Sequence, residues 1–233
     1  MPDFSNPVFW YAVAQIIVID LVLSGDNAVV IALACRNLAP AQRRVGILWG
    51  VLGAVGLRVV LTAFAALLMD WPWLKIVGGI LLLWIGVKLL VPEQEGEHEI
   101  HGAGNVWGAV KTIIVADFVM SLDNVVAVAG ASHGSIPLLV FGLLVSIPII
   151  VFASQIIMKA MERMPIIVTL GAGLLGWVAG AMIFSDPAMR PLVAGQPAWL
   201  HYVASAVGAL VVVLIGWLIA RRRQAGYRVL EEG

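Results

Sequence analysis

The feature that most constrains the fold is a series of long segments that are apolar without interruption. A membrane helix needs about 20 mostly apolar residues, and seven segments meet this requirement, at residues 8–34, 45–69, 74–91, 107–131, 136–158, 165–184 and 199–220. Of the 233 residues, 61% are hydrophobic and 12% are charged, whereas soluble domains are about 45–50% apolar. Because the segments are continuously apolar instead of alternating, they predict helices and not barrel strands. The expected fold class is an all-α polytopic membrane protein with seven transmembrane helices.

Lysine and arginine are distributed unevenly between the two ends of these segments, which predicts an orientation. One set of ends carries eleven of the 14 basic residues, and the other carries only Lys75 and Arg190. Since short cytoplasmic loops are enriched in basic residues, we expect the N-terminus outside and the C-terminus in the cytoplasm. The remaining basic residue, Arg58, lies inside the second segment.

The two halves of the chain resemble each other. Residues 20–27 (DLVLSGDN) and 117–124 (DFVMSLDN) both follow the pattern D-x-x-x-S-x-D-N, and the third and sixth segments share one glycine-to-tryptophan spacing. Each copy has three segments, an odd number, so the second copy enters the membrane from the opposite side and an inverted repeat is predicted. We therefore predict one transmembrane domain over residues 1–233, with repeat 1 at about 8–91, a cytoplasmic loop at 92–106, repeat 2 at about 107–184 and an additional helix at about 199–220.

The doubled motif places carboxylates where membrane insertion penalises them. A charged residue at the centre of a membrane helix costs from about 2.5 kcal/mol upward, so four acids at matched positions indicate a function. On a continuous helix Asp20 and Asn27 share a face but Asp26 does not. We therefore expect the first copy to be interrupted at Ser24 and Gly25, which are poor helix formers. The second copy has Ser121 and Leu122 there, which supports a break less well.

The donor atoms of the motif are carboxylate, amide and hydroxyl oxygens. Such oxygens suit Mg²⁺, Ca²⁺ and Mn²⁺, whereas thiolates and imidazoles suit Zn²⁺ and Cu⁺. The predicted metal ligands are Asp20, Asp26, Asn27, Asp117, Asp123 and Asn124. For Asn27, Asn124 and the two serines, a hydrogen bond to a neighbouring helix is the competing interpretation.

Several further residues are candidate accessory groups. Ser24, Ser121 and Arg58 accompany the motif, and Ser146 in the fifth segment could supply another oxygen. Arg58 would hold the site near neutrality by pairing with an acid, and snorkelling to the interface is the alternative. A second candidate metal site lies in the cytoplasmic loop, at Glu95, Glu97, His98 and His101, although a short charged loop is usually only solvated. We interpret Asp70 and Asp186 as ordinary loop charges.

The doubled motif, the inverted three-helix repeats and the extra seventh helix resemble the TerC family of integral membrane proteins, and within it the shorter YjbE-type members. The resemblance implies membership of the LysE-like transporter superfamily and export of Mn²⁺, with metal supply to extracytoplasmic enzymes as a further implied role. It also implies that the family's acidic pairs correspond to Asp20 with Asp26 and to Asp117 with Asp123. The family name refers to tellurium resistance. Tellurite is an oxyanion that would need basic donors, and the residues of the motif do not suit it.

Together these observations predict a secondary transporter in a bacterial cell membrane that exports divalent cations, with protons as the coupling ion. No P-loop motif is present, so ATP is not expected to drive it directly. We expect no enzymatic activity, no resident cofactor and no nucleic-acid partner, with Mn²⁺ as the bound ligand. Two alternatives stay open: a membrane partner of the translocation machinery that metallates exported enzymes, and an intramembrane aspartyl protease. Four acids in repeated pairs fit the protease poorly, because it requires one tuned pair.

Overall fold

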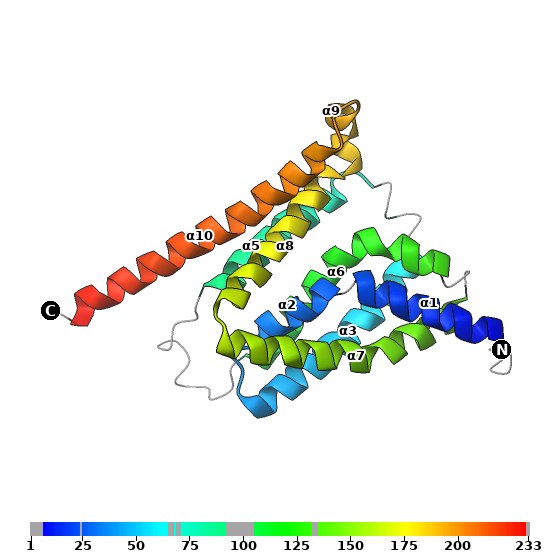
Figure 1. Cartoon of the computed structure of the whole chain (residues 1–233), viewed down its shortest axis with the longest axis horizontal. Coiled ribbons are helices and arrows are strands. Elements are labelled where there is room, and N and C mark those ends of the chain that lie inside the picture. Colours follow the sequence, from blue (N-terminus) through cyan, green and yellow to red (C-terminus); the bar gives the residue numbers. More distant parts are fainter. Residues whose placement is uncertain are drawn as a thin grey trace. The chain divides into compact units, whose positions relative to one another are not determined.

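The computed structural model describes residues 7–23, 25–64, 68, 71–91, 105–131 and 135–231, and every element in these ranges is helical (Figure 1). The long helices are α1 (Pro7–Leu23), α2 (Gly25–Cys35), α3 (Pro40–Ala63), α5 (Leu74–Leu90), α6 (Val106–Ala131), α7 (Ile136–Arg163), α8 (Ile166–Phe184) and α10 (Trp199–Glu231). Two short helical turns, η1 (Pro187–Met189) and α9 (Arg190–Val193), lie between α8 and α10.

Each of the seven predicted segments contains a helix, although several boundaries differ. The first segment forms two helices, α1 and α2, whose axes differ in direction by 54°. Helix α3 begins earlier than predicted, at Pro40, because proline is well tolerated in the first turn, where its missing N–H costs nothing. Helix α10 continues past the predicted end at 220 through Arg221 and Arg222 to Glu231, because arginine is a good helix former.

Several of these helices are long and apolar enough to cross a membrane. Helices α3, α7 and α8 and the Trp199–Arg222 part of α10 qualify individually, and the bent pair α1–α2 makes a fifth span if it is counted as one. Helix α5 has 17 residues, slightly fewer than a full bilayer crossing requires. The predicted all-helical class with several membrane spans is confirmed. The total of seven spans, the inverted repeat and the orientation of the termini stay predictions.

The helices group into two compact units. Unit 1 comprises residues 1–71 and 103–162 and contains α1, α2, α3, α6 and α7. Unit 2 comprises residues 72–102 and 163–233 and contains α5, α8, α9 and α10. Each unit therefore draws helices from both predicted repeats, and both copies of the acidic motif belong to unit 1.

Unit 2 is packed through glycines on α8 and α10. A Cβ placed on Gly180 would lie 2.2 Å from the carbonyl oxygen of Ala204, and one placed on Gly208 would lie 2.1 Å from that of Gly176. Only glycine allows such approaches. Because lipid is as apolar as the side chains, close backbone packing is a main source of helix association in a membrane.

Asp186 joins the start of α5 to the end of α8 within unit 2. Its carboxylate is buried and accepts hydrogen bonds from the backbone N–H groups of Trp73 at 3.0 Å, Lys75 at 3.0 Å, Ile76 at 3.2 Å and Ala188 at 2.7 Å. Burial alone would raise the pKa of Asp186, but these four N–H donors hold its pKa below the usual range.

The interpretation of Asp186 as an ordinary loop charge is therefore wrong. The N-cap residue of α5 is Trp73, which offers no side-chain cap and has a left-handed backbone with φ of 73°. Asp186 supplies the missing cap from a distant part of the chain, and its negative charge also suits the positive end of the helix dipole.

Candidate cation site

A cluster of buried polar side chains lies inside unit 1. Five helices contribute to it: α1 supplies Asp20, α2 Asn27, α3 Arg58, α6 Asp117 and Ser121, and α7 Ser146. Each of these residues is at most 5% exposed. Buried ionised groups require partners, and the hydrogen bonds of this cluster supply them.

Arg58 is the centre of the cluster. Its Nη1 donates to Asp20 Oδ1, its Nη2 donates to Asp117 Oδ1 at 2.5 Å, and its Nε donates to Ser121 Oγ at 3.0 Å. The guanidinium thus forms ion pairs with one acid from each copy of the motif. It pairs within the protein instead of snorkelling to an interface. Removing one member of such a buried pair costs about 3–5 kcal/mol, because an uncompensated charge is left behind.

The two carboxylates are held by further neutral groups. Ser146 Oγ donates to Asp20 Oδ2 and also lies 2.8 Å from the carbonyl oxygen of Leu143. Ser121 Oγ lies 3.3 Å from Asp117 Oδ2, and Asn27 Nδ2 donates to Asp117 Oδ1 at 2.7 Å. Asp20, Asp117 and Arg58 together carry one net negative charge when both acids are ionised.

The side-chain oxygen of Asn27 has no hydrogen-bond partner among the described residues. Donation by its Nδ2 to Asp117 fixes the orientation of the amide. Its Oδ1 is then buried and receives no hydrogen bond from any residue that the structure describes. A buried acceptor without a partner beside a carboxylate is unfavourable, unless a ligand, an ion or a water supplies the missing partner.

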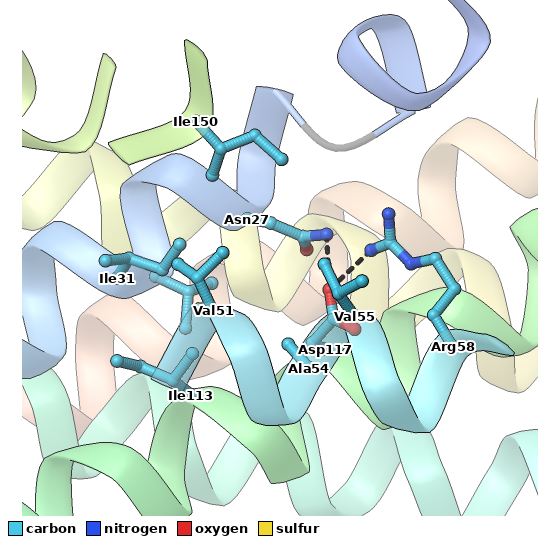
Figure 2. Close-up of a pocket in the computed structure, with 10 residues that line it drawn as sticks. Asn27, Ile31, Val51, Ala54, Val55, Arg58, Ile113, Asp117 and Ile150 are labelled. Atoms are coloured by element: carbon cyan, nitrogen blue, oxygen red, sulfur yellow. Dashed lines mark hydrogen bonds and ion pairs between the residues drawn. The ribbon is translucent and has the colours of Figure 1, made fainter. Parts of the chain in front are cut away.

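A small pocket of about 20 Å³ begins at this cluster (Figure 2). Asn27, Asp117 and Arg58 lie together at one end in the close-up, and Ile31, Val51 and Ile113 line the other. The apolar lining residues are Val30, Ile31, Val51, Ala54, Val55, Ile113 and Ile150. The pocket is therefore polar at the end where the cluster lies and apolar at the other end.

The two copies of the motif have different backbones. The first copy is divided between α1 and α2, and Asp26 lies in the first turn of α2, where its Oδ1 accepts from the backbone N–H of Asn27 at 3.0 Å. The second copy runs through the continuous helix α6. The first copy is therefore interrupted between α1 and α2, as expected, whereas α6 continues through Ser121 and Leu122.

The structure brings together part of the predicted ligand set. Asp20, Asn27 and Asp117 meet at the cluster, Asp26 is half-buried at the start of α2, and Asn124 is half-buried on α6. Asp123 belongs to α6, but its side chain lies outside the described residues, as do Ser24 and the loop residues Glu95, Glu97, His98 and His101. Among the described residues, no three His, Cys, Asp or Glu side chains lie close enough together to hold a metal ion by themselves.

Ser146 is the member of the cluster that the sequence indicates least clearly. It lies outside the acidic motif, and its only signal is that it is a polar residue in an apolar helix. A serine flanked by Val145 and Ile147 is a weak signal, and its contact with Asp20 depends on how α7 packs against α1.

The fold and the cluster define a class, which is a multi-pass helical membrane protein with a charged site inside its helices. The family model of the integral membrane protein TerC family matches residues 5–225. The chain therefore belongs to the TerC family, as the motif comparison predicted.

Three relatives of this chain are described as bacterial membrane proteins. The uncharacterized membrane protein YjbE of Bacillus subtilis is 47% identical over 171 residues, which cover 73% of this chain and 78% of YjbE. The uncharacterized membrane protein YceF of the same organism is 28% identical over 60% of this chain and 58% of its own length. The inner membrane protein YgdQ of Escherichia coli K12 is 24% identical over 78% of this chain and 84% of its own length. No solved structure matches this chain.

Proposed function

We propose that this protein is a secondary transporter that exports a divalent cation, Mn²⁺ in the first instance, through a site between Asp20 and Asp117. The observation that carries the proposal is the convergence of two buried acids, one from each copy of the motif, beside the orphaned Oδ1 of Asn27. Ionisable groups inside a membrane protein usually mark an ion pathway. Membership of the TerC family supports the same class of function.

The donor atoms favour a hard divalent cation. Asp20 and Asp117 offer carboxylate oxygens, Asn27 an amide oxygen, and Ser121 and Ser146 hydroxyls. Two carboxylates balance the charge of one divalent cation. Oxygen donors of this kind suit Mn²⁺, Mg²⁺ and Ca²⁺.

The pocket supports entry of the cation from the cytoplasm. Ile31 lies between Asn27 and the Cys35 end of α2, Val51 lies between Arg58 and the Pro40 end of α3, and Ile113 lies between Asp117 and the Val106 end of α6. In the predicted orientation these three helix ends face the cytoplasm, so the pocket lies on the cytoplasmic side of the carboxylates.

The transported charge sets the energy that coupling must supply. Moving a divalent cation outward against a membrane potential costs about 4.6 kcal/mol per 100 mV, twice the cost for a single charge. Protons moving inward, bound by the same acids, are the proposed driving ion.

Metal flux in proteoliposomes tests the proposal. The unmodified protein is compared with Asp117→Asn under an imposed pH gradient, with Mn²⁺ flux as the measurement. We expect Asp117→Asn to lower the flux about tenfold to a hundredfold, because interactions with a charged group are worth about 1.5–3 kcal/mol.

Glu162→Gln is the matched control. It makes the same acid-to-amide change at an exposed residue, whose ion pair with Arg43 has a distance of 2.5 Å and lies outside the cluster. Such surface pairs are worth about 0–1 kcal/mol, so flux should stay near that of the unmodified protein. A folded unmodified protein without Mn²⁺ flux, or equal flux in Asp117→Asn, would refute the proposal.

The alternatives receive less support. Arg58 gives Asp20 and Asp117 a fixed cation, whereas an aspartyl protease needs two carboxyl groups that share a proton. The metallation-partner alternative depends on the loop from Glu95 to His101, which lies outside the described residues.

A further inference from the structure

We propose that Arg58 is a tethered counter-cation: it occupies the carboxylates of the site when no metal is bound, and the incoming metal ion must displace it. This inference rests on the proposed function and adds to it a competitor that belongs to the protein itself. It assigns Arg58 a part in the transport cycle instead of a purely structural ion pair.

The contacts of Arg58 coincide with those that the metal ion would need. Its two terminal nitrogens hold Oδ1 of Asp20 and Oδ1 of Asp117, which are the two carboxylates proposed to bind the cation. The guanidinium and a metal ion cannot share these oxygens at full strength, because both need the same lone pairs and both are positively charged. Binding of one therefore weakens binding of the other.

Arginine suits this role better than a titratable residue. Its guanidinium remains protonated at physiological pH, and its planar fork can contact two carboxylates at once. A covalently attached cation cannot diffuse away, so the two acids keep a partner throughout the cycle. Arg58 is 4% exposed, and bulk water does not screen its charge.

A displaced guanidinium has other groups to approach. Ser121 already accepts from its Nε, and Asp26 lies in the first turn of α2, next to Asn27, which donates to Asp117. A short swing of the side chain would leave Asp20, Asp117 and the unused Oδ1 of Asn27 to the metal ion.

The tethered cation also accounts for the return step of a transporter. Two uncompensated carboxylates inside a membrane protein would resist reorientation of the metal-free state. With Arg58 between them, this state carries one net negative charge instead of two. The inference thus predicts opposite effects of removing Arg58 on metal binding and on turnover.

The test is equilibrium binding of Mn²⁺ to the purified full-length protein in detergent, compared between the unmodified protein and Arg58→Gln. We expect Arg58→Gln to bind Mn²⁺ at least about tenfold more tightly, because the competitor is absent, and to transport it more slowly. A folded Arg58→Gln variant with equal or weaker affinity would overturn the inference.

Arg58→Lys keeps the test decisive if Arg58→Gln does not fold. A single ammonium cannot bridge two carboxylates as the guanidinium does, so Arg58→Lys should bind Mn²⁺ about twofold to tenfold more tightly than the unmodified protein. Unchanged or weaker binding by a folded Arg58→Lys variant would also overturn the inference.

The outcomes separate this inference from the proposed function. Mn²⁺ binding by the unmodified protein without a gain in the Arg58 variants refutes only the tethered cation. No Mn²⁺ binding by the unmodified protein or by either variant refutes the proposed function and this inference together.

Discussion

Asp186 and the Arg58 cluster illustrate two ways of burying a charge. Asp186 is surrounded by backbone N–H donors, so its ionised form is stabilised by neutral dipoles. Asp20 and Asp117 are instead stabilised by a covalently attached cation, Arg58. The first arrangement has no place for a ligand, because its donors are backbone N–H groups. In the proposed function the second exchanges one cation for another, and this difference would separate a structural acid from transport acids.

Replacing Asp186 with asparagine should destabilise unit 2. The amide loses the charge and turns an N–H₂ group toward N–H donors, so we expect a loss of about 1.5–3 kcal/mol. Thermal unfolding of the purified protein in detergent measures this loss. Glu162→Gln is the control, because the same change at an exposed residue should shift the midpoint little.

The lowered pKa of Asp186 also predicts a pH dependence. A carboxyl group whose pKa is lower in the folded state stabilises the fold above its unfolded pKa of about 3.9. The contribution is lost as the pH falls from there toward the folded-state pKa. Unfolding midpoints measured between neutral and acidic pH should therefore fall less steeply in Asp186→Asn. Parallel curves for the two proteins would contradict the assignment.

At the scale of helices, glycines decide how closely α8 and α10 approach. Gly176, Gly180 and Gly208 each place backbone against backbone, at distances where a Cβ would clash with a carbonyl oxygen. A backbone atom cannot move aside as a flexible side chain can. The packing of these helices is therefore specified by small residues at particular positions and not by hydrophobicity, which every face of α8 has.

Gly180→Ala should separate α8 from α10. Its Cβ would lie 2.2 Å from the carbonyl oxygen of Ala204, so we expect a destabilisation of about 1–3 kcal/mol, which is typical of overpacking. Gly173→Ala is a control in the same helix, because its nearest neighbour is Val213 Cγ2 at 3.4 Å. That change should be neutral or slightly stabilising, since alanine favours helix by about 1 kcal/mol over glycine. Equal unfolding midpoints for the two variants would show that α8 and α10 do not pack this closely.

At the scale of the whole molecule, orientation depends on summed positive charge and not on any single contact. Most of the basic residues lie at one set of helix ends, and this asymmetry predicts which ends stay in the cytoplasm. The same prediction decides on which side of the carboxylates the pocket lies. An inverted orientation would place the pocket on the outer side of the carboxylates and would favour uptake over export.

Labelling of single cysteines tests the orientation. In a Cys35→Ala background, Gln196→Cys, between α9 and α10, should react with a membrane-impermeant maleimide in intact cells. Arg222→Cys, on α10, should react only after permeabilisation. Both positions are exposed, so access to the reagent depends on the side of the membrane. The reverse labelling pattern would invert the predicted topology.

The sequence by itself determined the all-helical class, the approximate helix positions and the polar motif. It did so because lipid cannot satisfy backbone hydrogen bonds, so a long and continuously apolar run is stable in the membrane as a helix. It also identified Asp20, Asn27, Asp117 and Arg58 as unusual, since charged and polar residues in such runs are costly.

Only the tertiary structure decided which of these groups meet. The bridge from Arg58 to both Asp20 and Asp117, the contact of Ser146 with Asp20, and the capping of α5 by Asp186 all join residues that lie far apart in the chain. Such contacts depend on the rotation and packing of each helix about its axis, and local spacing contains no information about either. A run of apolar residues specifies a helix, whereas the partner of a buried charge is specified by every helix around it.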